Sequence, residues 1–384
     1  MLPIVSEKLS HLSQAQVNEL IRRYYSNEKI ADLIKEYAIK VQPSQLVKEF
    51  PANIHEIICE YCSHNMVSYY QSKNSHPSES EPKCPNCGHI DSDSCYCKNC
   101  RANAAAIQQK QIAVQREYIK GYIHSLNISS VSLRDLSFEE KVYLGAFVRE
   151  GISEDFNYIN PIETFINPLA PTQRLQDEIL VSLSRSKRLL VLSPHSDINC
   201  FPDLEVSSGN LSYYPTMVKW SLNVIEDGIN KVPLVEKVMN PSEEYGAEEQ
   251  YMLWRKIALE ESIEYLVFSI KNVLKTDYTV GEKTVAVLSD ILNNFSVSQV
   301  YGIIYSATNN ALRFKAERMV SGKHAANTVI GYAQSHADKA IAGSWDLKKY
   351  GRRDCPQSAV SKFFFERILK NGSDGFYTKP ELKE

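Results

Sequence analysis

Three cysteine motifs lie close together in the chain: Cys59-Glu-Tyr-Cys62, Cys84-Pro-Asn-Cys87-Gly-His89 and Cys95-Tyr-Cys97-Lys-Asn-Cys100. They hold seven of the nine cysteines of the protein. Two cysteines separated by two residues can direct both thiolates at one tetrahedral ion, as structural zinc sites require. A disulfide cluster is the alternative, but it needs an oxidising compartment, and the N-terminal residues show no secretory signal. The motifs therefore predict a zinc-binding segment.

The number of candidate ligands is enough for two zinc ions. Four protein ligands on each ion leave no position free for water, so both sites would be structural rather than catalytic. Two pairings are open. In the sequential pairing, the first four ligands along the chain, Cys59 to Cys87, bind one ion, and the next four, His89 to Cys100, bind the other. In the interleaved pairing, Cys59 and Cys62 share an ion with the last cysteine motif. The predicted ligands are Cys59, Cys62, Cys84, Cys87, His89, Cys95, Cys97 and Cys100, with His64 and His76 as alternatives.

The segment from about residue 57 to 101 resembles zinc-ribbon modules, of which the turn Cys84-Pro-Asn-Cys87-Gly-His89 is typical. The resemblance implies a small, metal-stabilised platform. It implies no particular activity.

Residues 1–56 are expected to form three short helices. Ser13 can cap the first (14–25), Asn27 can cap the second, and Pro43 suits the first turn of the third. Three short helices at this spacing resemble a helix-turn-helix domain of the resolvase or homeodomain-like kind. The resemblance implies DNA reading by the third helix, and a plain three-helix bundle is the alternative. Over residues 43–50, the outward polar side chains would be Ser44, Gln45 and Lys48.

Length and composition describe an ordinary globular protein. The chain has 384 residues, 43% of them hydrophobic and 23% charged, which excludes collagen-like and wholly disordered chains. At about 150 residues per domain, the length suggests two or three domains. The longest apolar runs, such as Leu189–Leu192, are far shorter than the roughly 20 residues of a membrane span. We expect a cytoplasmic protein that does not bind membranes.

The net charge of −3 hides a division along the chain. Residues 128–300 carry 15 basic and 25 acidic side chains, a net charge of −10, whereas residues 301–384 carry 14 basic and 8 acidic ones, a net charge of +6. Such a division is expected where one part contacts a polyanion and another stays solvated or binds a protein. The acidic middle is therefore a candidate protein-binding region.

The rest of the chain has mainly helical periodicity, with long helices expected at 104–127, 138–149, 172–186, 248–275, 283–294 and 298–319. The predicted fold class is mainly α and multidomain, with a small β element. The predicted divisions are a helix-turn-helix-like domain (1–56), a two-zinc ribbon module (57–101), a helical spacer (102–130), an acidic mainly helical domain (131–300) and a basic helical C-terminal region (301–384). Residues 172–200 of the acidic domain would suit a winged helix or another small α+β element.

The basic end combines cations with the aromatic residues Trp345 and Tyr350. Basic side chains neutralise phosphates, and aromatic rings can stack on bases. The alternative is that these cations form salt bridges with the acidic middle of the same molecule. The candidate nucleic-acid contacts are Arg313, Lys315, Arg318, Lys323, Lys348, Lys349, Arg352 and Arg353.

Signals for catalysis are weak. The chain has neither a GxxxxGK[ST] phosphate-binding loop nor a GxGxxG turn. Three residues, His324, His336 and Asp338, could form a metal site if the chain folds back between them. The carboxylates of the predicted helix 248–275 are expected to face solvent; they belong to Glu260, Glu261 and Glu264.

Together these features predict a non-catalytic nucleic-acid-binding protein, with DNA as the expected polymer and zinc as a structural cofactor. A transcriptional regulator or a component of a microbial defence or mobile-element system would fit. The alternative is a protein–protein adaptor whose zinc module and acidic middle bind a partner while the basic end docks internally. A metal-dependent nuclease or hydrolase is the third hypothesis.

Overall fold

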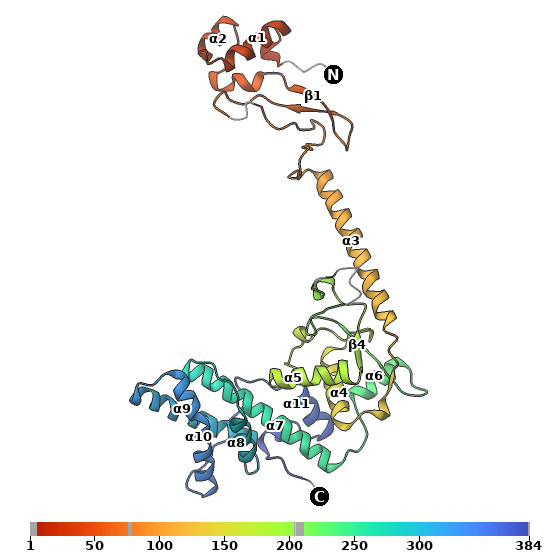
Figure 1. The fold of residues 1–384 in the computed structure, drawn as a ribbon, viewed down its shortest axis with the longest axis vertical. Helices are drawn as coiled ribbons and strands as arrows, with labels where there is room; N and C mark the ends of the chain where they lie inside the picture. The colour runs from red at the N-terminus through yellow and green to blue at the C-terminus, as the bar shows by residue number, and fades with distance from the viewer. Residues whose placement is uncertain (1–5, 76–78, 203, 205–210, 383–384) are drawn as a thin grey trace. The chain divides into compact units, whose positions relative to one another are not determined.

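The computed structural model describes residues 6–75, 79–202, 204 and 211–382. The chain forms two compact units, residues 1–114 and 115–384. Most of the secondary structure in the described residues is helical, and the short strands form two-stranded sheets, which confirms the predicted mainly α fold class (Figure 1). Among these residues, no helix combines the length and the hydropathy that a membrane span requires.

The first unit begins with a small helical bundle. Helix α1 (Gln14–Tyr25) has the predicted start, because the Ser13 and Gln16 side chains each bond the other residue's backbone amide. Helix α2 (Ile30–Glu36) follows Lys29 without a side-chain cap. The predicted cap at Asn27 is wrong: Asn27 has a φ of 64°, a left-handed conformation that asparagine tolerates and that turns the chain between the helices.

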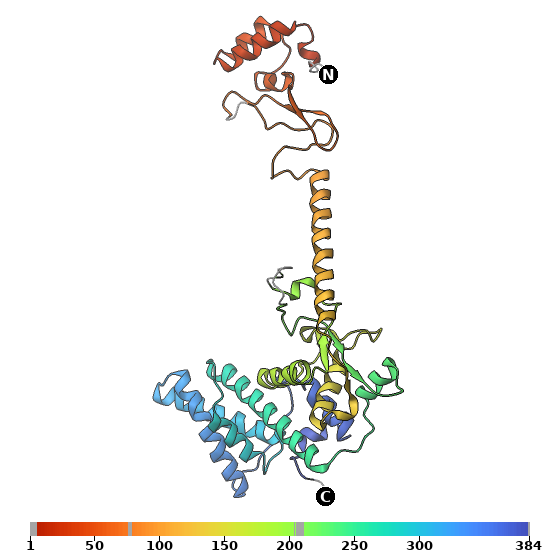
Figure 2. The same ribbon diagram turned by 45° about the vertical axis from the view of Figure 1, so that its right-hand side comes forward.

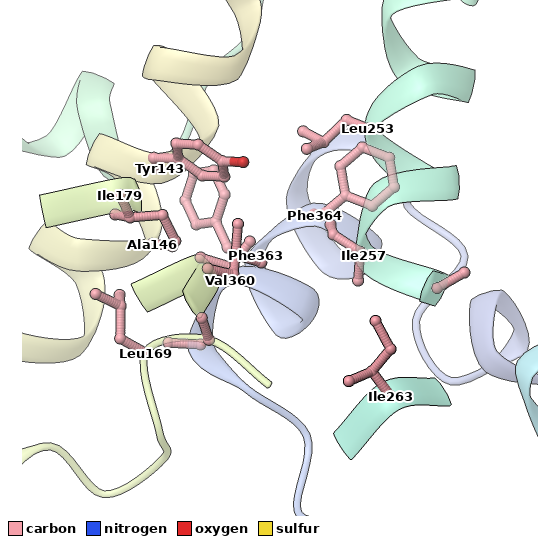
Figure 3. Packing of buried hydrophobic residues seen from close by; sticks show 14 of the residues in the cluster. Tyr143, Ala146, Leu169, Ile179, Leu253, Ile257, Ile263, Val360, Phe363 and Phe364 are labelled. Carbon is pink, nitrogen blue, oxygen red and sulfur yellow. The ribbon is translucent and has the colours of Figure 1, made fainter. Parts of the chain in front are cut away.

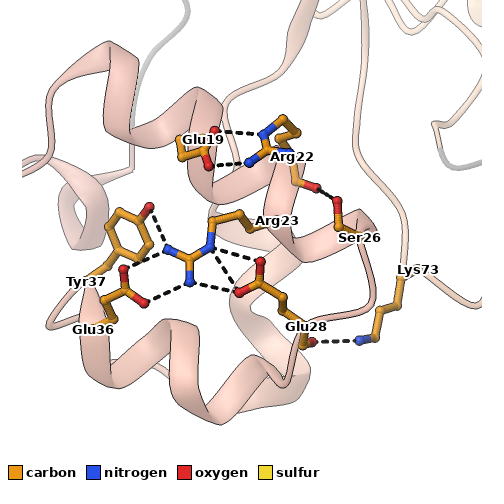
Figure 4. A network of polar contacts seen from close by, with 8 residues as sticks. All are labelled: Glu19, Arg22, Arg23, Ser26, Glu28, Glu36, Tyr37 and Lys73. Atoms are coloured by element: carbon orange, nitrogen blue, oxygen red, sulfur yellow. Dashed lines mark hydrogen bonds and ion pairs between the residues drawn. The ribbon is translucent and has the colours of Figure 1, made fainter.

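A single arginine joins the first two helices. Arg23 of α1 forms ion pairs with Glu28 at 2.8 Å and Glu36 at 2.7 Å, and its guanidinium lies over the Tyr37 ring (Figure 4). A planar guanidinium suits this geometry because it can serve two carboxylates and an aromatic face at once. Below this network, the apolar core consists of Leu9, Leu20, Tyr24, Leu33, Ile39, Leu46 and Phe50.

The third predicted helix is a 3-10 helix, η2 (Pro43–Glu49), with Pro43 in its first turn. A 3-10 helix is tighter than the α-helix expected at this position, and its side chains are spaced differently. The chain then enters an antiparallel hairpin of β1 (Asn53–Ile58) and β2 (Asn65–Ser68). Helix α3 (Lys98–Ser125) follows the last cysteine motif and runs from the first unit into the second.

The second unit has one large hydrophobic core. Helix α4 (Phe138–Gly151) packs against α11 (Ala359–Phe363), and Figure 3 shows Phe363 among the buried residues of this core. The Phe363 ring lies directly over Gly145. The pair β3 (Val131–Ser132) and β6 (Val224–Ile225) is parallel, and the pair β4 (Leu190–Leu192) and β5 (Trp220–Leu222) is antiparallel. The remaining elements before α7 are η3 (Leu133–Asp135), η4 (Ile162–Thr164), α5 (Gln173–Leu180), the π-helical η5 (Val181–Ser186), η6 (Ile198–Cys200) and α6 (Lys231–Met239).

The C-terminal part of this unit is a group of packed helices (Figures 1 and 2). Helices α9 (Val297–Arg318) and α10 (Gly322–Ile341) lie side by side, and α7 (Ala247–Ser269) packs on α9. Helix α10 was not predicted, because its buried face is built largely from alanines, which give a weak apolar signal. The other elements are the π-helical η7 (Ile270–Leu274), α8 (Glu282–Ile291), the π-helical η8 (Phe364–Ile368) and α12 (Asp374–Tyr377).

The acidic side of α7 is not a solvated face, so that expectation is wrong. Glu260 and Glu261 are each 2% exposed. Glu260 accepts hydrogen bonds from Thr172 and Arg174. Glu261 accepts a bond of 2.5 Å from Arg352. A buried carboxylate needs such partners because desolvation of an unpaired charge is costly.

The contact between α4 and α11 can be tested with a pair of glycine substitutions. A Cβ at Gly145 would lie 2.2 Å from the Phe363 ring, whereas a Cβ at Gly121, on α3, would meet nothing within 4 Å. We expect Gly145→Ala to lower the free energy of unfolding by about 1–3 kcal/mol through overpacking. Gly121→Ala should raise it by roughly 0.5–1 kcal/mol through helix propensity. Urea denaturation of the full chain measures both, and equal stability of the two variants would contradict the packing.

Candidate metal centres

The first cluster contains only cysteines. The Sγ atoms of Cys62 and Cys84 lie 3.2 Å apart, those of Cys59 and Cys87 3.5 Å, and those of Cys62 and Cys87 3.7 Å. Four sulfurs at about 2.3 Å from one tetrahedral ion would be about 3.8 Å from each other. The cluster therefore has nearly the dimensions of a four-thiolate metal site.

The backbone holds the two halves of this cluster in the same way. The amide of Cys59 donates to the carbonyl of His64 at 2.8 Å, and the amide of Cys84 donates to the carbonyl of His89 at 2.7 Å. The fifth residue of each turn is left-handed, with a φ of 57° at Ser63 and 73° at Gly88. Glycine adopts this conformation without strain, which explains its place after the second CxxC motif.

The second cluster has one histidine and three cysteines. Nδ1 of His89 lies 3.2 Å from the Sγ of Cys100, 3.4 Å from that of Cys95 and 3.9 Å from that of Cys97. A tetrahedral ion with zinc-like bond lengths would place nitrogen and sulfur about 3.6 Å apart. His89 is 6% exposed, so its ring is buried beside the three cysteines.

Two residues inside the first CxxC motif support this second cluster. Oε1 of Glu60 lies 3.6 Å from Nε2 of His89, the nitrogen that faces away from the cysteines. The Tyr61 ring packs edge-on against His89, and its hydroxyl lies 3.7 Å from the Sγ of Cys100. A carboxylate near the outer nitrogen of a metal-binding histidine orients the ring. The sequence interpretation missed both residues, although they lie between Cys59 and Cys62.

These distances favour the sequential pairing of ligands. The structure assembles Cys59, Cys62, Cys84 and Cys87 as one group that could hold a metal ion and His89, Cys95, Cys97 and Cys100 as another. All nine cysteines are free thiols. His64 does not join the first group, since its Nδ1 lies 2.8 Å from the backbone oxygen of Cys62. His76 lies outside the described residues.

The thiols of each cluster differ in acidity. Hydrogen bonding with Cys84 lowers the pKa of Cys62 to about 6, and the backbone amide of Ile90 lowers the pKa of Cys95 to about 6. Burial raises the pKa of Cys87 to about 12 and that of Cys100 to about 11. Cysteine binds a metal ion as the thiolate, so metal binding at either cluster would release protons from those cysteines that are still protonated.

The predicted nucleic-acid contacts of the first unit are accessible. Ser44, Gln45 and Lys48 are exposed on η2. They lie on a single 3-10 segment of seven residues rather than on an α-helix. Their role in reading DNA stays a prediction.

The cations of the second unit that are candidates for nucleic-acid contact lie in two groups. The first is the basic tip, which we define as Lys275, Lys315, Arg318 and Lys323. It forms where the end of η7 meets the turn between α9 and α10: Lys315 donates to the carbonyl of Leu274 at 3.2 Å, and a Cβ at Gly322 would lie 3.3 Å from the same oxygen. Lys275 was not predicted, because only the fold brings it to this turn.

The basic tip is open to solvent. Lys275, Arg318 and Lys323 are exposed, and so is Arg313 on the preceding turn of α9. Its acidic neighbours along the chain are Asp277 and Glu317, so the tip keeps a net positive charge.

The second group lies near the other end of α9. The loop that carries Lys348 and Lys349 packs on the first turns of this helix, because the amide of Tyr350 donates to the carbonyl of Ser298 at 3.1 Å. Gly302 of α9 lies under this loop, and Arg318 of α9 belongs to the basic tip. At about 1.5 Å of rise per residue, the two residues are about 24 Å apart along the axis of α9, so the two groups of cations are separate. Lys348, Lys349 and Arg353 are exposed, whereas Arg352 is committed to Glu261.

The three residues of the hydrolase hypothesis do not come together. His336 bonds Asn310 at 2.9 Å, Asp338 accepts from Gln334 at 3.1 Å, and the His324 ring lies against Phe314. Over the described parts of the chain, groups of three or more potential metal ligands occur only at the two cysteine clusters.

Comparison with protein families, with curated proteins and with solved structures finds no match for this chain. The chemistry of the clusters and of the surface therefore carries the functional argument.

The two metal centres can be counted separately. We expect elemental analysis of the purified full chain to find two metal ions, and Cys59→Ser and Cys97→Ser each to lose one, because each substitution removes a thiolate from a different cluster. Cys200→Ser is the matched control, since Cys200 is a buried thiol outside both clusters. If either cysteine variant of a cluster kept two metal ions per chain, the metal site assigned to that cluster would be contradicted.

Proposed function

We propose that the protein binds nucleic acid, with DNA as the expected polymer, through exposed cations on a scaffold stabilised by two structural zinc ions. The observation that carries this proposal is the basic tip, where the end of η7, followed by Lys275, meets the turn between α9 and α10, flanked by Lys315, Arg318 and Lys323. No catalytic step is part of the proposal.

Zinc is the metal that best suits the two clusters. Sets of four thiolates, or of three thiolates and one imidazole, are the usual ligands of structural zinc, and both clusters have near-tetrahedral spacing. Four protein ligands leave no open position for water or substrate. We therefore assign the ions a structural role.

The basic tip has the properties of a phosphate-binding surface. Lys275, Arg318 and Lys323 are exposed, and no carboxylate partner of theirs occurs among the described residues. Many other cations are already neutralised, as Arg23 is by Glu28 and Glu36. Free cations release counterions from a nucleic acid when they bind its phosphates, and this release drives binding.

Two further groups could add contacts. Ser44 and Gln45 offer hydrogen-bonding groups that can read base edges, and Lys48 can contact a phosphate. Lys348, Lys349 and Arg353 offer a second set of cations. Several weak contacts on one polymer increase the total affinity when they act together.

An adaptor is the second candidate function, and one observation favours it. Arg352 of the basic end forms a buried ion pair with Glu261 of the acidic middle, so part of the opposite charge is used inside the molecule. An adaptor would bind a protein, and its affinity for a duplex would be low and nearly independent of salt.

The basic tip is tested by removing its three exposed cations together. We expect Lys275→Ala/Arg318→Ala/Lys323→Ala to lower duplex affinity for all sequences and to reduce the slope of log K against log salt by about 2 to 3, because each lost phosphate contact removes about 0.9 from the slope. Fluorescence anisotropy at several salt concentrations measures both quantities.

A control with the same change in charge makes the result specific. Arg185→Ala/Lys187→Ala/Lys339→Ala removes three exposed cations that lie outside the basic tip in the same unit and should leave the slope unchanged. Equal losses of duplex affinity in the two triple variants would indicate a general effect of net charge and would contradict a role for the basic tip. A slope of log K against log salt near zero for the wild type would favour the adaptor.

A further inference from the structure

A groove in the second unit belongs neither to the metal centres nor to the basic tip. It has a volume of about 850 Å³ and lies between α7, α8 and the start of α5. Ile263, Glu264 and Val267 line the α7 wall, and Val285 and Ala286 line the α8 wall. These residues follow the spacing of one helical face on each side, so two helices present mainly apolar stripes to the same space.

The carboxylates of the groove are not all compensated. Glu260 is bonded to Thr172 and Arg174 at the start of α5. Glu264, one turn further along α7, has no hydrogen-bond or ion-pair partner among the described residues, and Glu282 is exposed on the α8 side. Since Arg174 is committed to Glu260, the negative charge of Glu282, and that of Glu264 once it is ionised, has no compensating cation in the groove.

The surroundings of Glu264 make the charge of this carboxyl group sensitive to a bound cation. Burial raises the pKa of Glu264 to about 8, the nearby Glu261 adds to the effect, and Arg352 opposes it. A half-buried carboxyl group without a partner is stabilised when a cation binds beside it. Ile263, Val267 and Val285 offer apolar contacts next to this carboxyl group.

We propose that this groove binds a small organic cation, with an ammonium group on Glu264 and an apolar body on the valine and isoleucine side chains. The volume lies in the range of small-molecule sites, which are mostly apolar and hold a few polar groups that orient the ligand. The charge selects a cation over an anion, and the apolar walls select an alkyl body over a hydrated metal ion. This inference is independent of nucleic-acid binding.

The test uses three probes of equal length on the full, metal-loaded chain. We expect n-hexylammonium to bind in a ligand-observed NMR titration at pH 8, n-hexanol to bind more weakly, and hexanoate not to bind. Glu264→Gln should weaken n-hexylammonium at least about tenfold, the loss expected when one partner of a charge-assisted hydrogen bond becomes neutral. Glu248→Gln, at an exposed position of the same helix, should bind like the wild type.

A second variant blocks the groove without touching its charge. Ala286 is exposed on α8, so Ala286→Phe should preserve the fold while its ring fills the space and abolishes binding. Absence of n-hexylammonium binding to the wild type would overturn the proposal. So would equal affinity for n-hexanol, or binding that survives both Glu264→Gln and Ala286→Phe.

Discussion

The close approach of four potential metal ligands in each of two clusters is the constraint on which the segment between the helical bundle and α3 depends. Among the described residues between the helical bundle and α3, the buried apolar cluster consists of Cys59, Met66 and Cys84, with a few partly buried neighbours. Two of these three residues are themselves candidate metal ligands. A segment with so little apolar core cannot offset its loss of conformational entropy by burial alone, and the metal binding that we propose would supply much of its folding free energy.

The second unit is stabilised in a different way. Its continuous core extends from Ile119 in α3 to Phe376 in α12 and contains the close contact between Gly145 and Phe363. Buried ion pairs at Glu260 and Glu261 connect α7 to α5 and to the C-terminal part of the chain. Such pairs favour one arrangement of helices, since removal of one partner would leave an uncompensated charge.

Much of the local structure was predictable, because local signals determine it. The Ser13 capping box, the start of η2 at Pro43 and the grouping of the cysteines all depend on residues close together in sequence. The burial of Glu260 and Glu261 was not predictable, because their partners lie 80 or more residues away along the chain. The same reason explains why Lys275 and the groove at Glu264 became visible only in the folded chain. Five candidate domains were predicted from composition, whereas the contacts divide the chain into two units near residue 114.

We propose that metal ligation holds together the segment between the helical bundle and α3, and hydrogen exchange with and without a zinc chelator tests this proposal. The amides of Val67, Lys83 and Cys84 are hydrogen-bonded in the folded segment. We expect chelation to remove their protection from exchange, while the amides of α4 in the second unit keep theirs. Retained protection at Val67, Lys83 and Cys84 after the metal has been removed would contradict this account.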